Sequence, residues 1–222
     1  MKLLSKFLMA SLVLTLAFAC SNQAEGDAAK VGDASDTVAT SSSDAKTYNV
    51  KEGTIYWTGS KKVGGSQHSG TINVSGGTIN VEGGSIASGN FNIDVSSIAT
   101  TDDLGDEMKA KLEGHLKSDD FFGAGTHPTG TFEVVSVAPA TGTEGVTHNV
   151  TGNLTIKGIT KSIIIPANVV VAGDMLTAVT PKFTINRTDW DAKYGSGLLG
   201  TAADQIINDD ISLNLEFKAS AG

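Results

Sequence analysis

The sequence predicts an all-β domain of antiparallel strands, and three observations lead to this prediction. Short stretches rich in Val, Ile, Thr and Phe recur between residues 71 and 217, separated by Gly, Asn and Asp. Apolar residues occupy every second position of residues 211–217, the pattern of a strand with one buried and one wet face. Only one segment has a helical period, and strands do not alternate with helices. These features predict an antiparallel barrel or sandwich of about eight to ten strands, and periodicity alone does not decide between the two.

Eight stretches carry the strand pattern. The first two are separated by Ser75, Gly76 and Gly77, which predict a tight hairpin because glycine adopts the positive φ angles that such turns require. The expected strands are residues 71–74, 78–81, 90–95, 131–137, 148–156, 162–171, 176–185 and 211–217.

The one expected helix covers residues 103–114. Leu104, Met108 and Leu112 recur at fourfold spacing, which places them on one helix face. Gly114 then predicts the C-terminal end of a short helix beside the sheet.

The N-terminus has the features of an exported lipoprotein. Lys2 and Lys6 precede an apolar run over residues 7–19, which is shorter than the roughly 20 residues that a membrane span needs. The sequence Leu-Ala-Phe-Ala before Cys20 resembles a bacterial lipobox, and Cys20 is the only cysteine of the chain. We therefore expect a signal peptide over residues 1–19 and lipidation, including palmitate, at Cys20. An ordinary signal followed by a chance cysteine is the alternative.

Residues 20–46 are predicted to form the lipidated cysteine and a disordered tether, and residues 47–222 to form one domain. The tether contains no aromatic residue and only two valines, so it has little apolar surface to offset the entropy of ordering. A chain of the remaining length can build one substantial core.

Charge and cysteine usage exclude several classes of protein. With Cys20 acylated the domain has no thiol, which rules out disulfides, zinc-thiolate sites and cysteine catalysis. The signal contains two lysines and no acid, so its removal changes the formal charge from −8 to −10. Such an acidic chain is not expected to bind nucleic acid, whose phosphates require clustered Lys and Arg.

Three weaker patterns favour ordinary structural roles. Residues 195–200 match the dinucleotide fingerprint Gly-x-Gly-x-x-Gly, but only 22 residues follow, too few for the parallel unit that this site requires. The four histidines lack metal-type spacing, and the paired carboxylates are neighbours in sequence, where caps and turns explain them better. We expect no cofactor, no metal and no catalytic residue. The histidines are His68, His115, His127 and His148, and the acid pairs are residues 102–103, 119–120 and 209–210.

From Tyr48 onward the chain resembles the YceI-like family of exported bacterial proteins, in motifs whose order and spacing cover nearly the whole domain. The resemblance implies an extended antiparallel lipocalin-like β-barrel of about eight strands with one short flanking helix. It also implies an elongated apolar cavity that holds a polyisoprenoid, such as a polyprenyl phosphate or a quinone-like lipid. The matching segments are residues 57–61 (WTGSK), 89–94, 97–98, 112–122 (LEGHLKSDDFF), 127–129 (HPT) with Phe132, 150–161 (VTGNLTIKGITK) and 185–190 (INRTDW).

Candidate ligand-binding residues come from the strand faces expected to point inward and from the matching segments. A barrel of about eight strands has an interior just wide enough for one slender ligand. Any one of these side chains could equally serve only as core. The candidates are Ile72, Val74, Phe91, Ile93, Val95, Phe121, Phe122, Leu154, Ile156, Arg187, Trp190, Ile211 and Leu213.

Arg187 is the only arginine among the 16 basic residues, and it shares strand parity with Phe183 and Ile185. We therefore expect it to point inward, where a guanidinium requires an anion. One hypothesis is a structural carboxylate, and the other is the phosphate of a polyprenyl ligand. The candidate carboxylates are Asp189, Asp210 and Asp120, and the lysines that could add charge around a phosphate are Lys61, Lys117 and Lys193.

The sequence thus predicts a protein that binds, sequesters or transports an isoprenoid-type lipid in the bacterial cell envelope without catalysis. The lipid anchor would attach it to the membrane, at a periplasmic or surface face such as that of the outer membrane, and a homodimer is left open. One alternative is an envelope enzyme acting on an isoprenoid or glycan through Asp119, His115 or Asp189. A second is a structural surface module with a filled core.

Overall fold

The computed structural model describes residues 24–222. The predicted signal peptide and Cys20 lie outside the described residues. Within these, no helix is both long and apolar enough to cross a bilayer.

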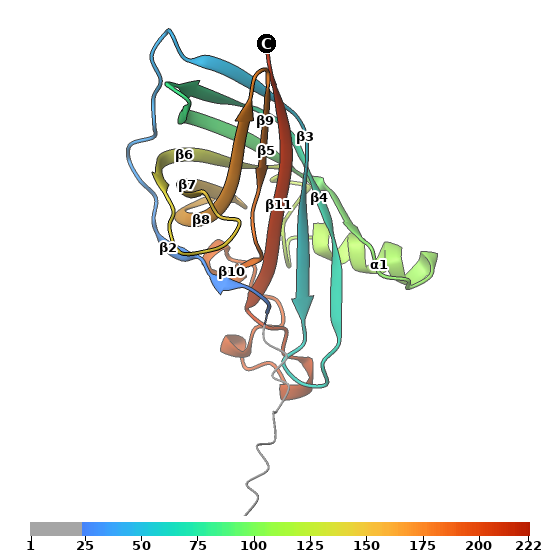
Figure 1. The fold of residues 1–222 in the computed structure, drawn as a ribbon. Helices are drawn as coiled ribbons and strands as arrows, with labels where there is room; N and C mark the ends of the chain where they lie inside the picture. Colours follow the sequence, from blue (N-terminus) through green and yellow to red (C-terminus); the bar gives the residue numbers. More distant parts are fainter. Residues whose placement is uncertain (1–23) are drawn as a thin grey trace, which may run out of the picture.

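Eight antiparallel strands close into a barrel (Figure 1). Each strand pairs with the next along the chain, and β11 completes the ring by pairing with both β3 and β9. The all-β fold and the barrel of about eight strands are therefore confirmed. The strands are β3 (Lys46–Ser60), β4 (Gln67–Glu82), β5 (Ser85–Thr100), β6 (Thr129–Pro139), β7 (His148–Ile156), β8 (Ile159–Ala172), β9 (Met175–Val179) and β11 (Asp210–Ala221).

The predicted hairpin at Gly76 and Gly77 is wrong, because β4 runs straight through it as one 16-residue strand. Both glycines have positive φ, and the register of β4 against β5 shifts beside them, as in a β-bulge. A Cβ on Gly77 would lie 2.2 Å from the Asn90 carbonyl oxygen, so only glycine permits this approach of the two strands. The turn lies instead between Glu82 and Ser85.

The stretch expected as one strand over residues 176–185 is two strands, β9 and β10 (Phe183–Asn186). Pro181 lies in the break, and proline has no N–H to donate to a strand ladder. The chain then passes through three short 3₁₀ helices: η1 (Arg187–Trp190), η2 (Gly197–Leu199) and η3 (Ala203–Gln205).

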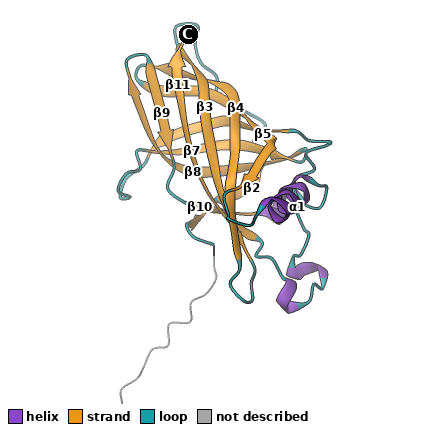
Figure 2. Ribbon diagram, turned by 90° about the vertical axis from the view of Figure 1, so that its right-hand side faces the viewer, coloured by secondary structure: helices purple, strands orange, loops and turns teal. Residues whose placement is uncertain are grey.

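One α-helix, α1 (Asp106–Lys117), lies outside the barrel against β5, as Figure 2 shows. It begins and ends three residues later than expected, so Gly114 lies within it. Asp106 and Glu107 in the first turn and Lys117 in the last complement the helix dipole. Leu116, the second-last residue of the helix, is buried, so tertiary packing extends the helix past the glycine.

The predicted disorder of residues 20–46 does not hold for residues 27–28 and 30–33, which form two short strands. β1 (Asp27–Ala28) pairs in parallel with β10, and β2 (Lys30–Asp33) pairs antiparallel with β8. Residues 24–35, which we call the N-terminal strap, therefore lie between β8 and β10, and within residues 24–222 these two strands do not pair with each other. The segment has few apolar residues, but its backbone satisfies two strand edges that would otherwise be open.

Candidate functional site

The barrel encloses an apolar cavity of about 90 Å³. Of the 13 candidate ligand-binding side chains, 11 line it: Ile72, Phe91, Ile93, Val95, Phe122, Leu154, Ile156, Arg187, Trp190, Ile211 and Leu213. The other two lie elsewhere. Phe121 lines only the mouth described below, and Val74 is buried without lining any of the three main cavities.

Several residues of the cavity wall were missed by sequence reasoning. Ile55 and Trp57 belong to β3, which was not among the expected strands. Ile163 and Ile165 lie in an expected strand, but Ile164 between them is also apolar, so no local alternation of apolar and polar residues assigned them to the inner face. The other wall residues outside the candidate list are Gly130, Phe132, Phe183, Ile185, Ala192 and Leu215, of which Phe183, Ile185 and Leu215 have the strand parity expected to point inward.

A wider cavity of about 530 Å³ forms the mouth of the barrel. The β3–β4 turn, α1 and the segment after β10 surround it, and its wall mixes apolar, aromatic and polar side chains, including Lys61, His68 and Tyr194. The side chains that line both this mouth and the interior cavity form the neck between them: Trp57, Phe122, Arg187, Ala192 and Ile211.

A third, apolar cavity of about 50 Å³ lies beyond the interior, at the end of the barrel away from the mouth. Aromatic rings pack where the two spaces meet, and those of Phe91 and Phe132 line both. The rings of Phe91 and Phe132 stack with centroids 5.0 Å apart, and Phe91 is 5.8 Å from Phe217. Ile165 and Leu215 also line both spaces, so only side chains separate the interior from the third cavity.

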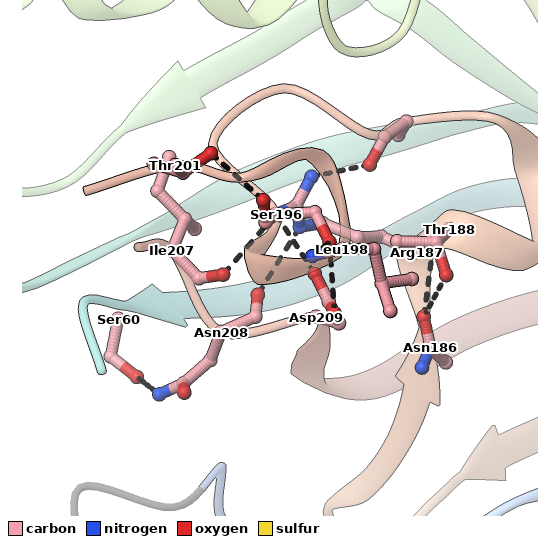
Figure 3. A network of polar contacts seen from close by, with 11 residues as sticks. Ser60, Asn186, Arg187, Thr188, Ser196, Leu198, Thr201, Ile207, Asn208 and Asp209 are labelled. Carbon is pink, nitrogen blue, oxygen red and sulfur yellow. Dashed lines mark hydrogen bonds and ion pairs between the residues drawn. The ribbon is translucent and has the colours of Figure 1, made fainter. Parts of the chain in front are cut away.

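The neck is held by Arg187, whose side chain is 4% exposed (Figure 3). Its Nε donates to the Asn208 carbonyl at 3.2 Å, and its Nη2 donates to the Ile207 carbonyl and to Asp209 Oδ1, both at 3.3 Å. Its Nη1 donates to the Ala192 carbonyl. Arg187 therefore ties η1 to the start of β11.

The carboxylate that meets Arg187 is Asp209, so the three named candidates, Asp189, Asp210 and Asp120, are wrong. Burial lowers the pKa of Arg187, and the charge of Asp209 opposes that shift. Ser196, fully buried, donates its Oγ hydrogen to Asp209 Oδ2 at 3.1 Å, which fixes the second carboxylate oxygen.

Trp57 supplies a different feature of the neck. Its side chain is 8% exposed, and its indole Nε1 is the buried side-chain polar atom that has no hydrogen-bond partner within residues 24–222. By contrast, Trp190 Nε1 donates to the Leu154 carbonyl at 3.1 Å. A buried donor without a partner costs free energy, so an acceptor atom of a ligand at the neck would be stabilised there.

Aromatic rings line the mouth beside α1. The His115 ring lies edge-on to Phe121 and to Tyr194, with centroids 5.0 and 4.6 Å away. His115 Nε2 is 3.0 Å from Asp120 Oδ2. Among the described residues, no group of three or more His, Cys, Asp or Glu side chains is placed to hold a metal ion.

The three residues named for the hypothesis of an envelope enzyme do not line the same cavity. Only His115 lines the mouth, whereas Asp119 and Asp189 are exposed and line none of the three cavities. The glycine-rich residues 195–200 form η2 and its flanking turn on the mouth. The strand that precedes them, β10, is antiparallel to β11, which is not the parallel unit of a dinucleotide site.

These features define a class of protein: an antiparallel barrel that encloses an apolar cavity and opens at one end through a neck with one buried arginine and a mouth of mixed polarity. The YceI-like domain model matches residues 37–219, and the chain belongs to the YceI-like family.

Similar proteins agree with this assignment. The chain is 38% identical over 69 residues to a UPF0312 protein of Pseudomonas aeruginosa and 33% identical over 110 residues to one of Ectopseudomonas mendocina. These matches cover 31% and 50% of this chain, and 34% and 49% of the relatives, so the chain matches no more than about half of their length.

Two solved structures show the same fold. A polyisoprenoid-binding domain from Saccharophagus degradans, implicated in plant cell wall breakdown, is 17% identical, with a TM-score of 0.56 over 79% of this chain and 98% of that one. BcnA of Burkholderia cenocepacia is 23% identical, with a TM-score of 0.51 over 76% of this chain and 96% of that one.

Proposed function

We propose that this chain is a lipid-anchored protein of the bacterial cell envelope whose barrel binds, sequesters or transports a long apolar lipid of the isoprenoid type. The observation that carries the proposal is the continuous order of mouth, neck and apolar interior along one barrel. The neighbour from Saccharophagus degradans, described as polyisoprenoid-binding, supports the ligand class.

The dimensions of the cavities favour a slender chain over a compact ring system. The interior volume of about 90 Å³ is well below the roughly 300–1,000 Å³ of sites that enclose drug-sized ligands. A narrow chain can enter such a space and extend it by turning the rings of Phe91, Phe132 and Phe217. The mouth, at about 530 Å³, has room for a bulkier polar end group.

The neck favours a ligand with a hydrogen-bond acceptor near one end. Trp57 Nε1 is a buried donor without a partner among the described residues, and Arg187 lines both adjoining cavities. A carbonyl, hydroxyl or phosphate oxygen at this level would accept from these groups while the apolar chain occupies the interior.

Native mass spectrometry of the protein with isoprenoid alcohols, and their phosphates, of increasing chain length tests the proposal. We expect one-to-one adducts with the wild-type protein and with Val170→Trp, which enlarges a half-exposed side chain on β8. Val95→Trp, which fills the interior cavity, should lose the adduct. Absence of any adduct would favour a filled structural module, and a product of altered mass would favour an envelope enzyme.

The anchor requires its own test, because Cys20 lies outside the described residues. We expect Cys20→Ser to move the protein from the membrane fraction to the soluble fraction, and the wild-type N-terminal peptide to carry acyl mass. A variant that stays in the membrane fraction would contradict the anchor without affecting the lipid-binding proposal.

A further inference from the structure

An uncharged loop with two exposed leucines borders the mouth. Residues 194–203 contain no Asp, Glu, Lys or Arg, although 18% of the chain is charged. Leu198 and Leu199, in η2, are 75% and 64% exposed and are the two most exposed large apolar side chains among the described residues. Tyr194, at the start of the loop, is 47% exposed.

The β3–β4 turn lies beside this loop and completes the rim. Lys62 N donates to the Ile206 carbonyl at 2.8 Å, and Lys61 forms an isolated bridge with Ile207. Both loops lie at the end of the barrel opposite the C-terminus (Figures 1 and 2). Val63, at the tip of the turn, is 52% exposed. We call residues 61–66 and 194–203 together the mouth lip.

The mouth lip also differs from the rest of the molecule in charge. It contains Lys61 and Lys62 and no acid, whereas the whole chain has 24 acids and a net charge of −8. Lys62 is exposed, and Lys61 lies near Gln205. Asp204, directly after the lip, is the nearest acid along the chain, and Lys193, directly before it, pairs with Asp191.

We propose that the mouth lip docks on an anionic phospholipid bilayer, with Leu198, Leu199 and Val63 in the interfacial layer and Lys62 at the headgroups. Exposed leucines at a protruding loop mark an interaction surface. The lip consists of loops of six and ten residues, fewer than the roughly 20–30 residues per side of a stable protein interface, so a second copy fits it poorly. Apolar tips beside lysines on an acidic protein match the chemistry of an anionic membrane surface.

Docking in this orientation would open the apolar cavity directly toward the bilayer, because the lip surrounds the mouth. Lys61, Tyr194, Gly195 and Thr201 belong to the lip and also line the mouth cavity. An apolar ligand would then pass between membrane and barrel without crossing bulk water. The docking itself does not depend on the lipid anchor or on ligand binding.

Vesicle flotation with matched variants tests the docking. All proteins are full-length and carry Cys20→Ser, so residues 1–23 contribute equally to each. On vesicles of phosphatidylethanolamine and phosphatidylglycerol, we expect Leu198→Ser/Leu199→Ser to bind at least about tenfold more weakly than the parent protein, since one buried leucine contributes at least about a tenfold change. Val170→Ser/Val179→Ser, which alters side chains 49% and 47% exposed on the outer wall, should bind like the parent.

Charge and insertion are measured separately. Lys62→Gln should weaken binding about fivefold on anionic vesicles and leave binding to phosphatidylcholine unchanged. A bimane label on Leu198→Cys should be quenched by lipids with brominated acyl chains, and a label on Val170→Cys should not.

Three results would overturn the proposal. The first is binding of the leucine variant within twofold of the parent together with an unquenched label at position 198. The second is equal loss of binding in the lip and outer-wall variants. The third is a parent protein that sediments as a dimer and a leucine variant that sediments as a monomer but binds vesicles like the parent. That result would assign the lip to a second copy of the chain.

Discussion

Replacing Arg187 with methionine should destabilise the barrel even when no lipid is present. The change keeps an unbranched side chain but removes hydrogen bonds to three backbone carbonyls and the ion pair with Asp209. The Asp209 carboxylate, whose side chain is 25% exposed, then keeps the hydrogen bond from the Ser196 hydroxyl but loses its cation. Removing one partner of a buried ion pair costs about 3–5 kcal/mol. Because Asp209 is partly exposed, we expect the free energy of unfolding to fall by about 3 kcal/mol, the lower end of this range.

Urea denaturation followed by tryptophan fluorescence measures this loss. Arg187→Lys should have intermediate stability, because lysine keeps the charge but cannot donate to four acceptors in the plane of a guanidinium. Adding Asp209→Asn to the methionine variant should restore part of the stability by removing the unpaired charge. A loss below about 1 kcal/mol for the methionine variant would refute a structural role. If affinity for a phosphorylated isoprenoid then fell while affinity for its alcohol did not, the phosphate hypothesis would take its place.

Three further changes test the fold. Val31→Asp in the strap should lower the free energy of unfolding by about 1–3 kcal/mol, because Val31 packs on the core, and unchanged stability in urea would show that the strap does not dock. Gly152→Ala should cost about 1–3 kcal/mol, because a Cβ there would lie 2.1 Å from the Phe132 ring, and a thermal midpoint equal to that of the wild type would contradict this packing. Trp190→Phe should cost at least about 1 kcal/mol by leaving the Leu154 carbonyl without its donor, and calorimetry showing no loss would assign that carbonyl another partner.

The prediction of the inner barrel wall was accurate where strands alternate regularly. Ile211 and Leu213 line the cavity because a period of two is fixed by the covalent geometry of an extended chain. The same rule failed in β4, where positive φ at Gly76 and Gly77 allows a bulge in place of a turn. It also missed β3, where Gly53 interrupts the alternation. A Cβ on Gly53 would lie 2.6 Å from the Cβ of Phe217, so the close packing of β3 against β11 requires glycine at this position.

The neck shows why parts of the site could not be predicted. The need of Arg187 for an anion followed from its charge, but the partner, Asp209, is 22 residues away, and three other carboxylates were equally plausible in sequence. The orphan donor on Trp57 is likewise a property of the assembled core, because every tryptophan carries the same N–H and only the surroundings decide whether it finds an acceptor.

By itself the sequence determined the antiparallel all-β class, the inward faces of the regular strands and the family. Tertiary structure alone decided the course of residues 27–33. Their composition gives them no reason to fold, and they order because β8 and β10 leave unpaired backbone groups that a passing strand can satisfy. Backbone hydrogen bonding of this kind depends on which edges the rest of the chain leaves open, and no local pattern of side chains encodes it.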